Sequence, residues 1–265
     1  MNIHPDKFKR MWDKVDSILG RMTPITLSQM KDIHLMDRLD FKFVAPVSLL
    51  PNLLEEMESD FMVQEANDKR IAPYTTQYFD TSDMGFFVMH QNKKLNRQKI
   101  RIRSYVEANI SFLEIKNKNN KGRTSKLRIP FTSQSVDSVN DFNEEKEFLS
   151  SHSIFDVNKL VPSLGNSFQR ITLVNNRKTE RITIDTNISF INYKTRREEQ
   201  LEPLMILELK QNGWMHSHFR DITAKLKIRQ DSFSKYCVGV VLTDSEVKYN
   251  RFKSKLIRLN KLLNQ

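Results

Sequence analysis

The sequence has few cysteines, few glycines and no long apolar run, and each shortage excludes a class of protein. The 265 residues include one cysteine, Cys237, so no disulfide can form within the chain, and a reduced, cytoplasmic setting is expected. Only six glycines occur, and none forms the glycine-rich loop of a P-loop nucleotide-binding protein. No stretch approaches the roughly 18 apolar residues of a membrane-spanning helix, and the charged residues 1–10 do not resemble a secretory signal.

Acidic residues are also in deficit. Lys and Arg number 43 against 32 Asp and Glu, which gives a formal net charge of +11. Such an imbalance favours a polyanionic partner: nucleic acid, an anionic lipid surface or a phosphate-rich small molecule. With 38% hydrophobic and 28% charged residues, the composition is that of a globular protein.

The pattern of apolar residues predicts a helical lead over residues 1–32 and one α+β domain over residues 33–265. The lead contains an amphipathic helix over 6–22, for which docking on the domain is favoured over covering a site or binding a partner. Asp80-Thr-Ser-Asp83 is interpreted as a turn or helix cap. Further helices are predicted over 27–35, 47–57, 136–151 and 247–263, and strands over 38–44, 71–79, 97–106, 110–118, 123–131, 166–175, 179–186, 188–194 and 203–211.

In these strands, basic residues or carboxylates often take every second position. Because successive side chains of a strand point to opposite faces, each strand has one Ile/Leu face and one charged face. An ordinary solvated sheet face would show the same alternation. However, the charged positions are mainly cationic: Lys42, Lys99, Arg101, Arg103, Lys116, Lys126, Arg128, Arg170, Arg181 and Lys210.

If these faces converge, the cluster needs a bound anion. Two like charges about 7 Å apart repel by roughly 2 kcal/mol at an effective dielectric near 20. Phosphate matches the cluster, because Arg binds its oxygens bidentately and Lys supplies point charges. Glu114 and Glu208 lie in the same rows, which a divalent cation shared with phosphate would explain. Antiparallel strands can close into a barrel lined by such residues.

A phosphate site, a solvated sheet face and nucleic-acid binding therefore remain open on these grounds. Nucleic acid is the least favoured partner, because Ile and Leu rather than aromatic stacking residues separate the cations.

A set of short motifs, in order along residues 33–243, carries a family resemblance. Each motif alone is weak, but the ordered set resembles the VTC domain, the polyphosphate polymerase domain of the vacuolar transporter chaperone family. That domain is one of the triphosphate tunnel metalloenzymes, which are related to the CYTH group. The motifs are Arg38-Leu-Asp-Phe-Lys42, Tyr78-Phe-Asp-Thr81, Lys99-Ile-Arg-Ile-Arg-Ser-Tyr105, Phe112-Leu-Glu-Ile-Lys116, Ser125-Lys-Leu-Arg128, Arg181-Ile-Thr-Ile-Asp185, Leu207-Glu-Leu-Lys210 and Phe233-Ser-Lys-Tyr236.

The resemblance implies an antiparallel β-barrel of the triphosphate tunnel fold, flanked by helices. It also implies a metal-dependent phosphotransferase that moves the γ-phosphoryl group of ATP onto polyphosphate. Glu208 would hold Mn²⁺ or Mg²⁺, with Glu114 as a second acidic candidate, and strand alternation adds Lys99, Lys116 and Lys210 as phosphate-binding residues. The catalytic phosphate contacts carried over by motif are Lys42, Arg101, Arg103, Lys126, Arg128, Arg170, Arg181 and Lys235.

Two departures from the family pattern keep other functions open. Phe168 stands where the polymerase pattern has Tyr. A module that binds polyphosphate or nucleotide without turnover therefore remains an alternative. The first strand has Arg38 and Asp40 where hydrolytic relatives have Glu-x-Glu-x-Lys, which argues against a multi-carboxylate hydrolase. A triphosphatase of the same fold remains the enzymatic alternative, and the sequence identifies no membrane-protein partner.

Overall fold

The computed structural model describes residues 5–31, 33, 38–120, 124–132 and 143–263. A mainly antiparallel sheet of 11 strands organises the fold. Eight strands pair in the order β2 (Arg38–Pro46), β11 (Leu204–Asn212), β9 (Glu180–Asn192), β8 (Leu160–Asn175), β4 (Ala72–Thr81), β5 (Arg97–Tyr105), β6 (Ile110–Lys118) and β7 (Thr124–Phe131).

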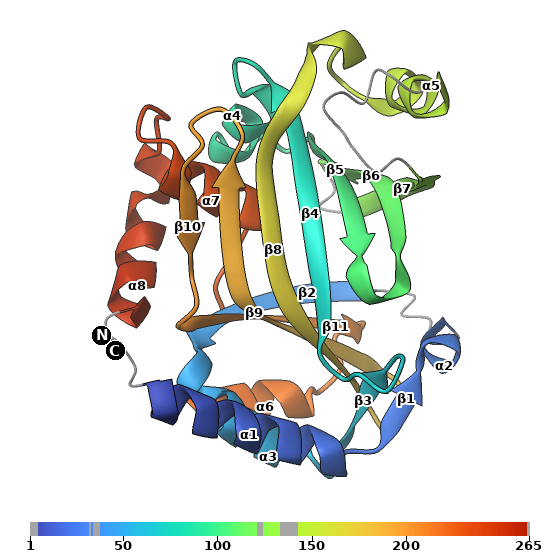
Figure 1. The fold of residues 1–265 in the computed structure, drawn as a ribbon, viewed down its shortest axis with the longest axis vertical. Coiled ribbons are helices and arrows are strands. Elements are labelled where there is room, and N and C mark those ends of the chain that lie inside the picture. The colour runs from blue at the N-terminus through green and yellow to red at the C-terminus, as the bar shows by residue number, and fades with distance from the viewer. Residues whose placement is uncertain (1–4, 32, 34–37, 121–123, 133–142, 264–265) are drawn as a thin grey trace.

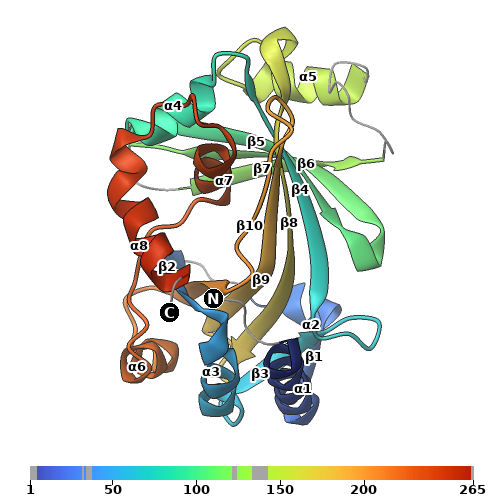
Figure 2. The same cartoon turned by 60° about the vertical axis from the view of Figure 1, so that its left-hand side comes forward.

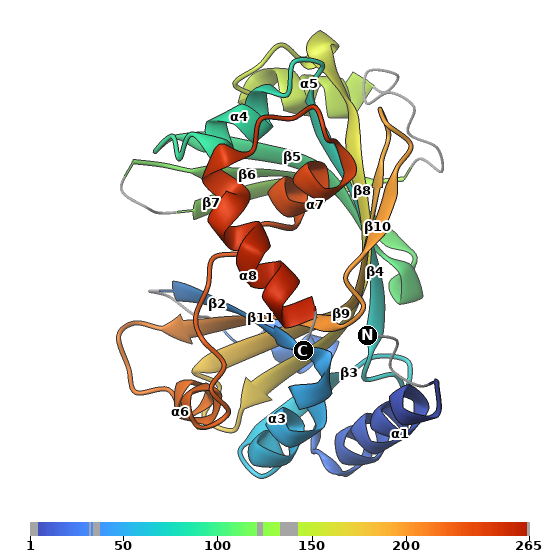
Figure 3. The same cartoon turned by 90° about the vertical axis from the view of Figure 1, so that its left-hand side faces the viewer.

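The sheet curves strongly, so that β2 and β11 lie opposite β5, β6 and β7 (Figure 3). Among the described strands, β2 and β7 end the order of pairing and do not bond to each other, so the sheet wraps round without closing. Three short strands extend it: β1 (Pro24–Thr26) pairs with β3 (Phe61–Glu65), β3 with β8, and β10 (Glu198–Gln200) with β9. The predicted antiparallel tunnel fold is confirmed.

Helices cover the convex face in two groups. The first group, at the bottom of Figure 2, contains α1 (Pro5–Arg21), α3 (Leu50–Met57), which follows a 3-10 turn over Val47–Leu49, and α6 (His218–Lys225). Their apolar side chains form one core with convex-face residues of β2, β8, β9 and β11. At the other end, α4 (Gly85–Gln91) and α5 (Asn143–His152) pack their Phe86 and Leu149 against β5 and β6.

The remaining helices lie on the concave side or at the N-terminal edge. The helix α7 (Lys235–Thr243) packs inside the curved sheet, and α8 (Lys253–Leu263) lies beside it (Figure 1). The short α2 (Leu27–Lys31) follows β1, and 3-10 turns occur at Val106–Ala108, Val157–Lys159 and Asn250–Phe252. No described helix has the length and apolar character needed to span a membrane.

The predicted N-terminal helix is present, and it docks. Val15 and Ile18 of α1 are 0% and 1% exposed, in one core with Leu50, Leu53 and Leu54 of α3. This packing follows from the apolar stripe at helical spacing, which must be buried against another element.

Several element boundaries differ from the prediction. The two strands expected over 179–186 and 188–194 form one strand, β9, interrupted by a bulge rather than by a turn. Ser189 lies opposite Ser167 and Thr186 opposite Gln169, so Asn187 and Ile188 face the single residue Phe168. Asn187 takes a positive φ of 49°, which asparagine tolerates.

The other differences concern short elements and the ends of predicted helices. The short strands β1, β3 and β10 and the helix α4 were not predicted, since they are too short to show a periodic pattern. The helix predicted over 136–151 is described only from Asn143, because residues 133–142 lie outside the described chain, as does part of the segment predicted over 27–35. The basic helix expected over 247–263 is α-helical only from Lys253.

Candidate functional site

The charged residues predicted by strand alternation share the concave face of the sheet. Arg101 lies opposite Glu114, which lies opposite Arg128 in the next strand, and Lys42 lies opposite Glu208. The Ile and Leu residues that alternate with them in β5 and β6 are buried on the convex face. Register and alternation place the following on the concave face: Lys42, Lys99, Arg101, Arg103, Glu114, Lys116, Lys126, Arg128, Arg170, Arg181, Glu208 and Lys210. We call the space they surround the tunnel.

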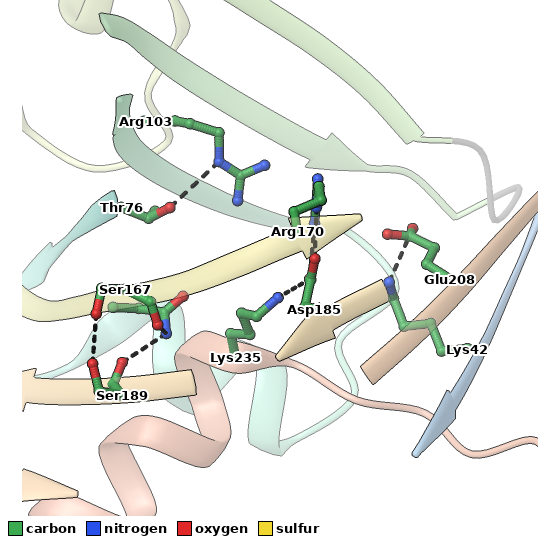
Figure 4. A network of polar contacts seen from close by, with 10 residues as sticks. Lys42, Thr76, Arg103, Ser167, Arg170, Asp185, Ser189, Glu208 and Lys235 are labelled. Carbon is green, nitrogen blue, oxygen red and sulfur yellow. Dashed lines mark hydrogen bonds and ion pairs between the residues drawn. The ribbon is translucent and has the colours of Figure 1, made fainter. Parts of the chain in front are cut away.

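Glu208 lies in β11, between the neighbouring strands β2 and β9. Its Oε1 accepts an ion pair from Lys42 Nζ at 2.9 Å, and its side chain is 16% exposed (Figure 4). Burial opposes ionisation, but Lys210 and Lys42 outweigh it and hold the pKa of Glu208 well below its ordinary value. Glu208 is therefore a carboxylate at neutral pH.

Asp185 joins three elements. Arg170 of β8 donates to both oxygens of the Asp185 carboxylate, at 2.6 and 2.8 Å, and Lys235 of α7 also donates to it (Figure 4). Burial opposes ionisation, yet Arg170 and Lys235 hold the pKa of Asp185 below its ordinary value. Asp185 was not among the predicted site residues, although its alternation with Arg181 placed it on the charged face.

Glu114 of β6 is bound by cations of the neighbouring strands β5 and β7. Its Oε2 accepts from Arg101 Nε and Nη2 at 2.9 and 2.7 Å, and its Oε1 accepts from Lys126 Nζ at 3.0 Å. Despite burial, Arg101 and Lys126 lower the pKa of Glu114 to about 2. Both oxygens are occupied, so Glu114 fits a metal-binding role less well than Glu208 does.

Several cations of the tunnel contact groups other than carboxylates. Lys99 Nζ donates to Ser234 Oγ at 2.9 Å, and Arg103 Nε donates to Thr76 Oγ1 at 3.3 Å. Lys116 makes no hydrogen bond or ion pair with the part of the chain that the structure describes. Arg181 Nη2 donates to the backbone oxygen of Met30 at 3.0 Å.

Burial lowers the pKa of the tunnel lysines. It brings the pKa of Lys116 to about 8, although Glu208 across the tunnel acts in the opposite direction. The pKa of Lys235 falls to about 7, because burial outweighs the attraction of Asp185. Burial also lowers the pKa of Lys99. Desolvated ammonium groups of this kind gain most from an incoming anion.

Aromatic rings pack against some of the cations. Phe168, 2% exposed, lies under Lys235 Nζ, which is 3.9 Å from the ring centroid. The ring stacks on Tyr74 with centroids 5.4 Å apart, and the guanidinium of Arg128 lies 4.4 Å from the centroid of Phe112. The residue that departs from the family pattern is therefore a buried support for Lys235.

The helix α7 brings Lys235 into the tunnel. Its N-cap, Ser234, accepts a hydrogen bond from the backbone N–H of Cys237 at 3.2 Å. Gly239 allows close approach to the sheet, because a Cβ there would lie 2.5 Å from Leu164 Cδ2 and 2.6 Å from Phe190 Cδ1. The cap fixes where α7 begins, and Gly239 lets the helix pack closely against β8 and β9.

Asp80 has the structural role that its motif predicted. Its carboxylate accepts from the backbone N–H groups of Phe86 and Phe87 at 2.8 and 2.9 Å, at the start of α4. The hydroxyl of Tyr236 also donates to it. Asp80 is thus a helix cap and is not part of the tunnel.

The donor set fits a metal shared with a substrate but not an all-protein metal site. Among the described residues, no three or more His, Cys, Asp or Glu side chains are grouped so that they could hold a metal ion. Mg²⁺ and related ions are commonly bound by one or two carboxylates together with substrate phosphates and water. The ionised Glu208 lies among Lys and Arg side chains, the residue types that commonly bind phosphate, and so matches that chemistry.

Comparisons with known proteins agree with this geometry at the level of the family. The family model described as the VTC domain matches residues 37–243. A search of the curated proteins found no match.

Solved structures that resemble the chain share little sequence with it. One is a protein from Hippeastrum named as an adenylyl cyclase and described as having a dominant triphosphatase activity, with 12% identity, a TM-score of 0.47, and 79% of this chain and 97% of that chain covered. A proposed adenylate cyclase from Vibrio parahaemolyticus has 11% identity and a TM-score of 0.43, covering 77% and 99%. The PH1819 protein of Pyrococcus horikoshii has 13% identity and a TM-score of 0.41, covering 77% and 98%.

Proposed function

Because this chain belongs to the VTC domain family and is a phosphoryl-handling protein of the triphosphate tunnel fold, we propose that it is a metal-dependent polyphosphate polymerase-type phosphotransferase. It transfers the γ-phosphoryl group of ATP to the end of a phosphate chain held in the tunnel. The observation that carries the proposal is the set of half-buried cations around Glu208, with Lys116 acting on it from the opposite strands.

The reaction asks little covalent chemistry of the protein. A terminal phosphate oxygen of the acceptor forms a bond to the γ-phosphorus, the bond from that phosphorus to the β–γ bridging oxygen breaks, and ADP leaves with the electron pair. Positioning and neutralisation of charge are what a protein contributes to such a transfer. Arg101, Arg103 and Arg170 offer guanidinium groups that bind phosphate oxygens in a water-poor space.

Mn²⁺ or Mg²⁺ bound by Glu208 and phosphate oxygens would neutralise the charge that develops on the transferring group. Lys42 holds the Glu208 carboxylate through its 2.9 Å ion pair. Arg170 and Lys235 share Asp185, which keeps both cations ordered in the absence of a ligand. Lys116 faces Glu208 from across the tunnel, and its ammonium group would help to neutralise a phosphate bound near Glu208.

A binding module without turnover is the second candidate, and Phe168 is the observation that favours it. Its ring supports Lys235 and Arg170 but offers no hydroxyl to a phosphate. Tight binding of tripolyphosphate, with no product from ATP in Mg²⁺, Mn²⁺ or Co²⁺, would select it. Release of orthophosphate without chain growth would instead select a triphosphatase.

The proposal is tested by incubating the pure protein with ATP and Mn²⁺ and resolving the products by chain length on a gel. Wild type should give long polyphosphate, and Glu208→Gln should reduce the rate by at least about 100-fold, because it removes the charge that holds the metal. Glu199→Gln, at an exposed position of β10, is the matched control and should keep the wild-type rate. Normal polymer from the Glu208→Gln variant would remove Glu208 from the mechanism.

A further inference from the structure

Cations stack in register across one end of β5, β6 and β7. Lys99 lies opposite Lys116, which lies opposite Lys126. Two residues farther toward the strand ends, Arg97 lies opposite Lys118. By alternation all five residues share the concave face. We call Arg97 and Lys118 the outer pair.

The outer pair has no carboxylate partner among the described residues. Within the described ranges, neither Arg97 nor Lys118 makes an ion pair, and Arg97 Nη1 donates to the backbone oxygen of Lys94 at 3.0 Å. In the tunnel centre, by contrast, Glu114, Asp185 and Glu208 each carry an ion pair. The positive charge of the outer pair is therefore uncompensated by the described protein.

This arrangement is costly without an anion. Side chains directly opposite each other in antiparallel strands have Cβ atoms about 5 Å apart, and like charges there are destabilising. Both members are half-buried, which weakens screening by solvent. The charges of the outer pair also act on His90. Burial is the main reason that its pKa falls to about 3, and the charges of Lys99, Arg97 and Lys118 lower it in the same direction.

The opposite end of these strands is different in character. Tyr105, at the end of β5, packs against Tyr74 and Phe112, with ring centroids 5.0 and 6.0 Å apart. The nearby cation Lys69 is paired with Glu107 at 2.9 Å. Of the two ends of β5 and β6, the end with the outer pair is thus the one that attracts an anion.

We propose that the outer pair is a holding subsite for the part of a long, linear polyanion that extends beyond the tunnel centre. The ligand class is inorganic polyphosphate, so the inference rests on the proposed function and deepens it. Adjacent rows on one face of a strand are about 6.7 Å apart. A chain passing over Lys99 and Lys116 can therefore reach Arg97 and Lys118, whereas a triphosphate bound around Glu208 and Arg101 does not.

The test compares ligands of two lengths on the double variant Arg97→Gln/Lys118→Gln. Affinity for long-chain polyphosphate should fall about fivefold or more, and its dependence on salt should become shallower by roughly 1.5 units of log–log slope, because two phosphate contacts are lost. Affinity for tripolyphosphate should change less than about twofold. Lys9→Gln/Arg10→Gln, on the exposed face of α1, removes the same charges elsewhere and should leave both affinities unchanged.

Three results would overturn the inference or what it rests on, and they are distinguishable. Unchanged binding of the long chain would show that the outer pair holds nothing. Equal weakening of both ligands would place the pair in the central site and end its separate role. If wild type bound neither ligand, the proposed function itself would fail.

Discussion

At the scale of single residues, the tunnel contains two kinds of positive charge. The guanidinium groups of Arg101 and Arg170 stay charged at any ordinary pH, and each is bound to a carboxylate. The ammonium groups of Lys116 and Lys235 are buried enough to lose their protons near neutral pH. The positive charge of the arginines is therefore permanent, whereas the charge of the lysines depends on pH.

We expect affinity for tripolyphosphate to fall as pH rises. Lys235, with a pKa of about 7, and Lys116, with a pKa of about 8, are charged below these values and neutral above them. Each lost charge should weaken binding about threefold to tenfold. Calorimetric titration with tripolyphosphate between pH 6 and 9 measures the change.

The control for this prediction is Lys116→Arg, which keeps a permanent charge at that position and should remove the upper part of the decline. Between the lowered pKa values and the ordinary lysine value, the folded chain binds fewer protons than the unfolded chain, so folding stability should rise with pH. Stability and affinity should therefore move in opposite directions, and a parallel fall would indicate unfolding instead.

At the scale of elements, the position of α7 decides whether Lys235 reaches the tunnel. The helix lies against β8 and β9 because Gly239 presents no side chain to Leu164 and Phe190. Ser234 caps the helix and also accepts from Lys99, so the cap connects α7 to β5. The bulge at Phe168 places a ring beneath Lys235.

Gly239→Ala should therefore impair both folding and binding. The added methyl group has to displace Leu164 or Phe190, at a cost of about 1–3 kcal/mol in the free energy of unfolding. A shift of α7 moves Lys235 away from Asp185, so affinity for tripolyphosphate should also fall. Chemical denaturation and calorimetric titration measure the two effects.

Gly20→Ala is the matched control for this element. Gly20 lies in α1, and an added methyl group there would have no neighbouring atom within 4 Å, so alanine should be neutral or should stabilise the helix by up to about 1 kcal/mol. Tripolyphosphate affinity should not change. An equal loss of stability in both variants would mean that close packing of α7 is not the cause.

At the scale of the whole molecule, the net charge of +11 attracts any polyanion, and the curved sheet selects among them. Many of the cations point into the concave space rather than over an open surface, and the Phe168 ring there is buried under Lys235. A phosphate chain without bases can enter such a space, whereas nucleic acid needs exposed rings for its bases.

We expect long-chain polyphosphate to displace single-stranded DNA of equal charge from the protein. At about 150 mM salt the DNA should bind at least about tenfold more weakly, since it retains only non-specific surface contacts. Competition measured by fluorescence anisotropy gives the ratio. DNA binding that polyphosphate fails to displace would restore nucleic acid as the partner.

Much of the fold and part of the site could be predicted from the sequence. Alternation in Lys99–Arg103 and Leu207–Lys210 correctly identified strands with one apolar and one charged face. The apolar stripe of residues 6–22 correctly predicted a docked helix. These features are local, because the pleat of a strand and the turn of a helix fix the direction of each side chain.

Which of these charges meet depends on how the elements pack together. Asp185 binds Arg170 and Lys235 from three different elements, and Lys116 faces Glu208 from across the tunnel. No local pattern encodes such meetings, because they depend on strand register, on the bulge opposite Phe168 and on how far the sheet curves. Alternation along the chain thus determines the charged face of each strand. Tertiary packing determines that these faces meet, because the convex apolar faces are buried under helices while the strands twist and curve round the concave side.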